Sequence, residues 1–137
     1  MKHVILAIAL LFEANAFALN QPTKAIPVTK YLVFAATTIA SGQTTSAAIP
    51  TSGGSLVGIQ LPAAFTGTAI TFQGSFDGVT YQPVYSTTGG TALSYTVAQG
   101  HYVAIDPTPF YGLSYIKLVS GSSEGGARSF SVALKGI

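Results

Sequence analysis

Clusters of turn-forming residues divide the chain from residue 31 onward into segments of about ten residues, a spacing that suggests a β-sandwich or a barrel. No segment after residue 20 shows sustained helical periodicity, so we expect almost no helix beyond the N-terminus. The sequence predicts strands at residues 31–39, 44–49, 55–61, 68–76, 81–86, 91–97, 101–105, 113–119 and 128–135. The predicted fold is therefore all-β, either an antiparallel β-sandwich or a jelly-roll-like barrel.

Alternation of apolar and polar side chains identifies the residues that we expect in the core. These residues are Ile70, Phe72 and Phe76, then Leu93, Tyr95 and Val97, and finally Phe130, Val132 and Leu134. Pro83 cannot donate a backbone hydrogen bond, so we place the strand that contains it at the edge of a sheet.

Charged side chains are scarce in this sequence. Six Lys or Arg and four Asp or Glu make up 7% of the 137 residues, against about a quarter in a typical soluble domain. A surface with so few charges is expected where neighbouring subunits cover it, so we interpret the chain as a component of an assembly. The net charge of +2 is scattered, whereas nucleic-acid binding needs a dense basic surface, and we expect no nucleic-acid partner.

Residues 1–18 support two interpretations. A basic start, the apolar run at 4–12 and the small residues Ala16 and Ala18 are typical of a cleaved secretion signal. If the run is retained, its side chains must be buried, and it then forms an arm inserted into a neighbouring subunit or laid across its own sandwich. The run is less than half of the roughly 20 residues that span a bilayer, so we expect no transmembrane helix. We divide the chain into an apolar arm and linker at 1–30 and a β-sandwich domain at 31–137.

One segment matches a catalytic motif. Gly121 to Gly125 reads G-S-S-E-G, the pattern of the nucleophile elbow, in which Ser123 would be the nucleophile. That elbow requires a helix after the serine and a histidine later in the chain. Both His3 and His101 precede Ser123, and a predicted strand follows it. We therefore interpret the segment as a flexible hairpin turn.

Two acidic residues are interpreted as turn residues rather than as catalytic or metal-binding groups. Asp106 begins a turn after the strand that contains His101, so we treat the two as unrelated. Asp77-Gly78 is the preferred pair for a type I′ hairpin, and a calcium site would need further carboxylates nearby. The chain has no cysteine. We expect no enzymatic activity, no metal site and no cofactor.

Tyrosines and the apolar arm are the residues that we expect at protein interfaces, because tyrosine combines a rigid apolar ring with a hydroxyl group. The predicted interface residues are Val4, Ile5, Leu6, Ile8, Leu10, Leu11, Phe12, Tyr81, Tyr102 and Tyr111. Exposed tyrosines would also stack on sugar rings, so carbohydrate binding stays open as an alternative. The absence of tryptophan leads us to favour protein contacts.

Three segments together resemble a group of small structural proteins of tailed bacteriophages. They are residues 70–85 (ITFQGSFDGVTYQPVY), 110–121 (FYGLSYIKLVSG) and 127–137 (ARSFSVALKGI). The shared features are an S-x-D-G turn followed by an aromatic residue, an aromatic-x-G-x-x-Y-I-(K/R)-(L/I)-x-S-G strand, and a closing strand that ends basic-x-hydrophobic. The matching positions are Ser75, Asp77, Gly78, Tyr81, Phe110, Gly112, Tyr115, Ile116, Lys117, Leu118, Ser120, Gly121, Lys135 and Ile137. The resemblance spans residues 56–137 and implies a β-sandwich subunit of the virion that sits on or stabilises the capsid shell.

The first hypothesis is therefore a non-enzymatic virion protein, a capsid decoration or cement subunit on the capsid surface that contacts the major capsid protein or other virion subunits. Such a subunit adds interface area across capsomer joints, so that opening of the shell must also break its contacts. Capsid symmetry favours a homo-oligomer, and we expect a trimer. The alternative is an exported carbohydrate- or surface-binding module with a cleaved signal. A phage tail or connector component is a third possibility.

Overall fold

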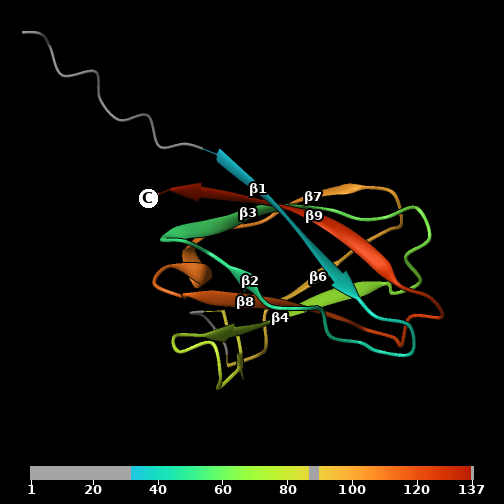
Figure 1. The fold of residues 1–137 in the computed structure, drawn as a ribbon, viewed down its shortest axis with the longest axis horizontal. Coiled ribbons are helices and arrows are strands. Elements are labelled where there is room, and N and C mark those ends of the chain that lie inside the picture. The colour runs from blue at the N-terminus through green and yellow to red at the C-terminus, as the bar shows by residue number, and fades with distance from the viewer. Residues whose placement is uncertain (1–31, 87–89, 137) are drawn as a thin grey trace, which may run out of the picture.

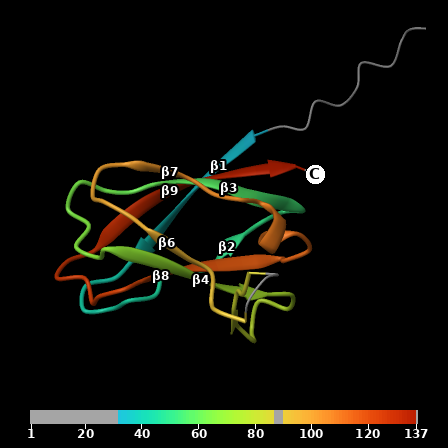
Figure 2. The same ribbon diagram turned by 180° about the vertical axis from the view of Figure 1, so that it is seen from behind.

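The computed structural model describes residues 32–86 and 90–136, which form two antiparallel sheets packed face to face (Figures 1 and 2). Sheet A has the order β1-β9-β3-β7 and contains β1 (Leu32–Ile39), β9 (Arg128–Gly136), β3 (Gly54–Gln60) and β7 (Tyr102–Ala104). Sheet B has the order β2-β8-β4-β5, with β6 also paired to β4, and contains β2 (Ile49–Pro50), β8 (Tyr115–Ser120), β4 (Ala69–Ser75), β5 (Gln82–Pro83) and β6 (Ser94–Thr96). Two separate sheets make the fold a β-sandwich, which confirms the first of the two predicted architectures.

Each predicted strand region contains a strand of the structure, although several strands are shorter than expected. Regular pairing of the predicted strand at 81–86 is limited to Gln82–Pro83, and that at 44–49 is reduced to Ile49–Pro50 with isolated bridges at Thr45 and Ser46. Pro83 does lie in an edge strand, as its missing N–H requires. Among the described residues, the one helical element is the 3₁₀ turn η1 (Thr108–Phe110).

Apolar side chains from the facing sides of both sheets form the core. Its largest fully buried members are Phe65, Phe72, Phe110, Phe130, Ile39, Ile49, Leu56, Ile59, Leu61, Ile70, Ile116 and Leu118. Phe72 meets Phe110 of η1 edge-to-face with 5.0 Å between ring centroids, and Phe65 meets Phe130 at 5.5 Å. Such aromatic pairs add about 0.5–1.5 kcal/mol to the free energy of burial. The connecting segments that carry Phe65 and Phe110 thus contribute to the same core as the strands.

A β-bulge in β3 adjusts which side chains face the core. Leu56 pairs with Leu134 of β9, but Gly58 pairs with the next residue, Ala133, so Val57 is an extra residue in β3. Because of this shift, Leu56 and Ile59 both point inward although they are three residues apart. Simple alternation would have placed one of them in solvent.

The predicted core is confirmed at Ile70, Phe72, Phe130, Val132 and Leu134, which are all buried. Leu93, Tyr95 and Val97 are half-buried and pack against the margin of the core.

The prediction for Phe76 is wrong, because β4 ends at Ser75 and the Phe76 side chain is 75% exposed. Gly74 is buried instead, with Leu113 packed so closely that a Cβ atom on Gly74 would lie 2.6 Å from a Leu113 methyl.

Phe72→Ala and Phe76→Ala form a matched pair that tests this assignment. We expect Phe72→Ala to lower the free energy of unfolding by about 3–5 kcal/mol, because it leaves a cavity in the core. We expect Phe76→Ala to change it by less than about 0.5 kcal/mol, because that ring is exposed. Urea denaturation of the two variants measures both values. Equal losses of stability would contradict the orientation of β4.

Candidate interaction surface

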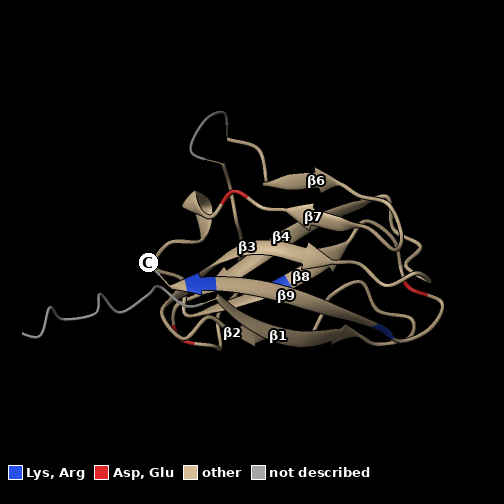
Figure 3. Cartoon of the chain, turned by 90° about the horizontal axis from the view of Figure 1, so that it is seen from above, with Lys and Arg blue, Asp and Glu red and all other residues tan. Residues whose placement is uncertain are grey.

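Charged groups are few within the described residues (Figure 3), and most of them have partners in the fold. They are Asp77, Asp106, Lys117, Glu124, Arg128 and Lys135. The ammonium of Lys117 lies 3.8 Å above the centre of the Tyr81 ring, a cation–π contact. Large areas of the surface formed by these residues therefore carry no charge, as the sequence composition predicts.

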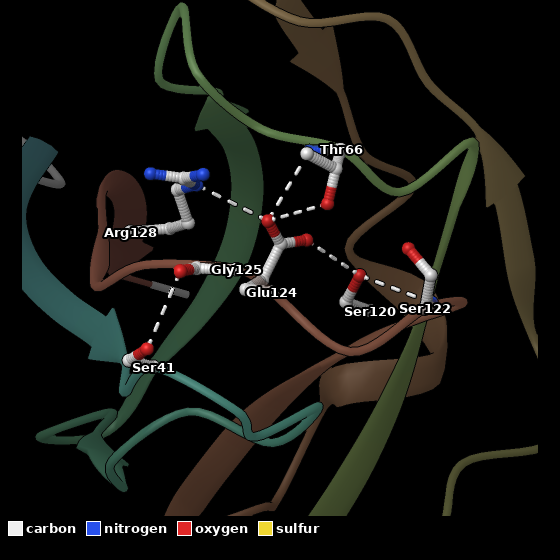
Figure 4. Close-up of polar contacts among 7 residues, drawn as sticks. All are labelled: Ser41, Thr66, Ser120, Ser122, Glu124, Gly125 and Arg128. Atoms are coloured by element: carbon white, nitrogen blue, oxygen red, sulfur yellow. Dashed lines mark hydrogen bonds and ion pairs between the residues drawn. The ribbon is translucent and has the colours of Figure 1, made fainter.

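The Glu124 carboxylate is fully buried and binds three segments of the sandwich: the β3–β4 connection, the end of β8 and the start of β9 (Figure 4). The backbone N–H and hydroxyl of Thr66 donate to Oε2 at 3.2 and 2.8 Å. Ser120 at the end of β8 donates its hydroxyl to Oε1 at 2.9 Å, and Arg128 at the start of β9 donates from Nε to Oε2 at 3.2 Å. These four hydrogen bonds satisfy both oxygens of a group that water does not reach.

The backbone of Glu124 holds a fourth segment, the connection between β1 and β2. Its N–H donates to the carbonyl of Gln43 at 3.0 Å, and its carbonyl accepts from the N–H of Gly42 at 2.7 Å. Burial raises the pKa of the Glu124 carboxyl, but hydrogen bonds from Thr66, Ser120 and Arg128 outweigh it, so the pKa lies below its ordinary value. Glu124 is therefore held as an anion and links the two sheets.

Residues 121–127 do not form the flexible hairpin that the sequence suggested. They connect β8 in sheet B to β9 in sheet A, so they cross between the layers, and the buried Glu124 fixes them in place. Ser123 is exposed beside Glu124, and strand β9 rather than a helix follows it. A nucleophile elbow has a helix in that position.

The residues that follow the C-terminal end of β4 form a tightly hydrogen-bonded turn. Oδ1 of Asp77 accepts the N–H groups of Val79 and Thr80, each at 2.8 Å, and the hydroxyl of Ser75 at 2.9 Å. These bonds, led by those from Thr80 and Val79, lower the pKa of Asp77 to about 2. Gly78 has a φ of +76° but Asp77 does not have positive φ, so this is not the type I′ hairpin suggested by the sequence.

This turn presents large apolar side chains to solvent. Phe76 is 75% exposed and Val79 is 83% exposed, on either side of Asp77. Tyr85 after β5 and Tyr111 after η1 are each about half exposed. We call Phe76, Val79, Tyr85 and Tyr111 the loop-end surface. The sequence analysis missed Phe76 and Val79, although the Asp77-Gly78 turn signal marks the point where β4 has to end.

A depression of about 350 Å³ lies within this region. Phe76, Tyr85 and Pro83 contribute apolar side chains to it, and Pro109 and Leu113 line it from the η1 side. Its polar lining residues are Ser75, Asp77, Thr80 and Gln82. It can therefore accept a compact side chain or ligand with both apolar and hydrogen-bonding groups.

The three tyrosines predicted at an interface lie on different parts of the molecule. Tyr81 contacts Lys117, which faces outward from sheet B. Tyr102 projects from β7 over Gly58, where an added Cβ would meet its hydroxyl, and is 58% exposed on the outer face of sheet A. Tyr111 belongs to the loop-end surface. The predicted arm residues 4–12 lie outside the described residues.

His101 and Asp106 have separate partners, as expected for unrelated residues. Nδ1 of His101 lies 2.8 Å from the carbonyl oxygen of Gln99, while Oδ1 of Asp106 accepts the N–H and hydroxyl of Thr108 at 3.0 and 2.8 Å. Within residues 32–86 and 90–136, no three His, Asp or Glu side chains gather in a way that could hold a metal ion. No helix in this part of the chain is long and apolar enough to cross a bilayer.

No family model matches the chain, and no curated protein matches it in sequence. Among solved structures, the SPBc2 prophage-derived protein YomS is similar, with a TM-score of 0.50 and 12% identity over 79% of this chain and 97% of that one. The module CBM32-1 from a family 31 glycoside hydrolase of Clostridium perfringens has a TM-score of 0.47 and 18% identity over 86% of this chain and 85% of its own. The chain thus shares the fold of a prophage-derived protein.

Glu124→Gln tests the role of the buried carboxylate. We expect it to lower the free energy of unfolding by about 1–3 kcal/mol at pH 7, because an amide NH₂ group would leave donors of Thr66 or Arg128 unpaired. Because the Glu124 pKa is lower in the folded protein, its stabilisation is present above the ordinary value of 4.5 and is lost as pH falls through the folded pKa. Glu124→Gln should remove that acid sensitivity in urea denaturation between pH 7 and pH 2.5.

The neighbouring Ser123→Ala is the control for this measurement, because Ser123 is exposed. It should leave stability within about 0.5 kcal/mol of the wild type at each pH. Wild-type stability and acid sensitivity in Glu124→Gln would refute the proposed role of the carboxylate.

Proposed function

We propose that this chain is a non-enzymatic structural subunit of a bacteriophage virion, and that it decorates and stabilises the capsid shell through protein–protein contacts. The observation that carries the proposal is the loop-end surface, where Phe76 and Val79 stand almost fully exposed on a turn fixed by Asp77. Exposed apolar side chains grouped on one surface mark interaction sites, and large side chains of this kind are the usual anchors of an interface.

The fixed turn makes these side chains effective anchors. Three hydrogen bonds to Asp77 hold the backbone on which Phe76 and Val79 are mounted. Docking of a preformed turn loses less conformational entropy than docking of a flexible loop. Each buried Phe or Val side chain contributes about 1.5–3 kcal/mol from removal of apolar surface from water.

The scarcity of charge supports the same proposal. Few ions on the described surface need to be desolvated when a neighbour covers it, and Glu124 and Arg128 already pair with each other. The sequence resemblance to tailed-phage structural proteins and the fold shared with a prophage-derived protein are consistent with a virion role. On a shell, many copies would each add a modest contact, and opening of the shell would have to break all of them.

Binding to virus particles that lack this chain tests the proposal. Purified full-length protein should co-sediment with such particles and raise the temperature at which their shells open. The double substitution Phe76→Ser with Val79→Ser should reduce the number of bound copies at least about tenfold at the same concentration, because it removes two apolar anchors.

Phe34→Ser is the matched control, because it removes a ring that is 70% exposed but belongs to β1. It should retain binding at saturating protein concentration. Particles that bind no wild-type protein, or that bind the double variant as well as the wild type, would exclude the proposed docking surface.

Carbohydrate binding is a second candidate, and the depression beside Phe76 and Tyr85 favours it. Exposed aromatic rings can stack on sugar rings, and Gln82 and Thr80 in the same lining offer hydrogen-bonding groups. The bound group in this case would be a polysaccharide on a cell or particle surface.

Tyr85→Ala separates the two candidates. If the depression binds sugar, this variant should lose at least about tenfold in affinity for a bound polysaccharide on a glycan array, while Tyr102→Ala should not. Tyr102 is a suitable control, because it is similarly exposed but lies on sheet A. Absence of any glycan binding by the wild type would eliminate this second candidate.

A further inference from the structure

Strand β1 is at the edge of sheet A, and its residues 32–36 have no strand partner on the outer side among the described residues. Along its length β1 pairs with β9 from Leu32 to Ile39. On its other side, the N–H of Ala47 donates to the carbonyl of Thr38 at 3.0 Å, and the Thr37 hydroxyl donates to the carbonyl of Ala47 at 2.8 Å. The segment that contains Ala47 therefore covers the C-terminal end of β1, but it does not reach residues 32–36.

The direction of the free backbone groups follows from the bond to Ala47. In an antiparallel strand, the N–H and C=O groups of alternate residues point to the same side. Since the Thr38 carbonyl points away from β9, the backbone groups of Leu32, Phe34 and Ala36 point the same way. Within the described residues, these three residues therefore present a row of unpaired donors and acceptors. They lie at the margin of sheet A, where Figure 3 shows β1 as the outermost strand.

This edge lacks the features that usually prevent strand pairing. Natural edge strands are protected by charged side chains, proline, bulges or short length. The sequence LVFAATTI of β1 has no charge and no proline, and its register with β9 is regular over eight residues. Leu32 and Phe34 are 50% and 70% exposed. The edge is thus suited to accept another strand.

We infer that β1 pairs with β1 of a second copy of this chain, antiparallel and about a two-fold axis beside Phe34. Phe34 would then face Phe34 of the other copy, and Leu32 would face Ala36. The row of free groups would make about six new hydrogen bonds and join the two A sheets into one. The two exposed phenyl rings would lie opposite each other on the same face of the joined sheet.

A second copy is the partner that this edge fits, because the segment is complementary to itself. Residues 32–36 are uncharged, so antiparallel pairing brings no like charges together. Among the described residues, the cation nearest to residues 32–36 is Lys135, which pairs with Leu32 across the sheet. In the proposed dimer the two Lys135 residues would be roughly 20 Å apart, more than the Debye length of about 8 Å at physiological salt.

Five paired residues on each side form a small interface, so we expect the free dimer to be weak. Its population would rise when many copies are held close together on a larger assembly. Capsid symmetry led us to expect a trimer, whereas this pairing gives a dimer. The inference depends on β1 alone and holds whether or not the loop-end surface binds a shell.

Cysteine substitution in the full-length chain tests the pairing, because the natural sequence has no cysteine. The Cα atoms of two Phe34 residues would lie about 5.5 Å apart, within the range that a disulfide bridges. Under mild oxidation, Phe34→Cys should form a covalent dimer at least about tenfold faster than Thr38→Cys, whose two copies would be roughly 27 Å apart in this register. Phe76→Cys is a second control, because Phe76 is similarly exposed on another surface.

Phe34→Lys provides an independent measurement, because it places two like charges opposite each other. Sedimentation equilibrium should show a monomer–dimer equilibrium for the wild type and a monomer for Phe34→Lys, with unchanged thermal unfolding. Equal cross-linking rates for the three cysteine variants, or a wild type that stays monomeric at millimolar concentration, would overturn the inference.

Maleimide labelling of Phe34→Cys in dilute protein tests whether another segment of the same chain already covers β1. Rapid labelling is expected for an open edge. Protection from labelling in a monomer would mean that another segment of the same chain covers β1, and it would also overturn the inference. If the proposed function is correct, Phe34→Lys should still bind virus particles at saturation, whether or not β1 pairs with a second copy. Loss of strand pairing and loss of particle binding are therefore measured separately, and failure of this inference can be told from failure of the proposed function.

Discussion

The buried anion of Glu124 is the interaction on which the arrangement of the two sheets depends most directly. A sandwich core resists separation of its layers, but its direction-independent apolar contacts do not by themselves fix how the connections run. Glu124 fixes them at one end, because its carboxylate and backbone bind the segments around Thr66, Ser120, Arg128 and Gln43. Only a fully hydrogen-bonded geometry compensates for the burial of its charge. Arrangements of these connections that leave the carboxylate without its hydrogen bonds are therefore strongly disfavoured.

The two ends of β4 differ in chemistry, so the residues that stabilise the fold are separate from those that we propose to bind a partner. At the Ala69 end, buried polar bonds around Glu124 close the molecule. At the Ser75 end, the polar bonds of Asp77 lie within the turn itself and leave Phe76 and Val79 in solvent. A substitution at the loop-end surface can therefore change binding without loss of the fold, which makes the proposed function accessible to mutation.

Much of the fold could be predicted from the sequence, but the candidate surface could not. Strand positions and the inward residues of β4 and β9 follow from alternation, which is a local property. Phe76 continues that alternation in the sequence, yet it is exposed because β4 ends one residue earlier. The Glu124 network was also beyond prediction, since Thr66 is 58 residues away from Glu124 in the chain. Because this distant contact does not show in the local pattern, residues 121–127 were interpreted as a hairpin turn.

By itself, the sequence determined that this protein is all-β, poor in charge and organised into short strands with Pro83 at an edge, because periodicity, composition and proline geometry act locally. Only the tertiary structure decided which apolar side chains remain outside and which edge stays open. Those outcomes depend on where each strand ends and on what packs beside it, as Ala47 does at the end of β1 and Leu113 does over Gly74. Burial is a property of the assembled layers, and no single segment encodes it.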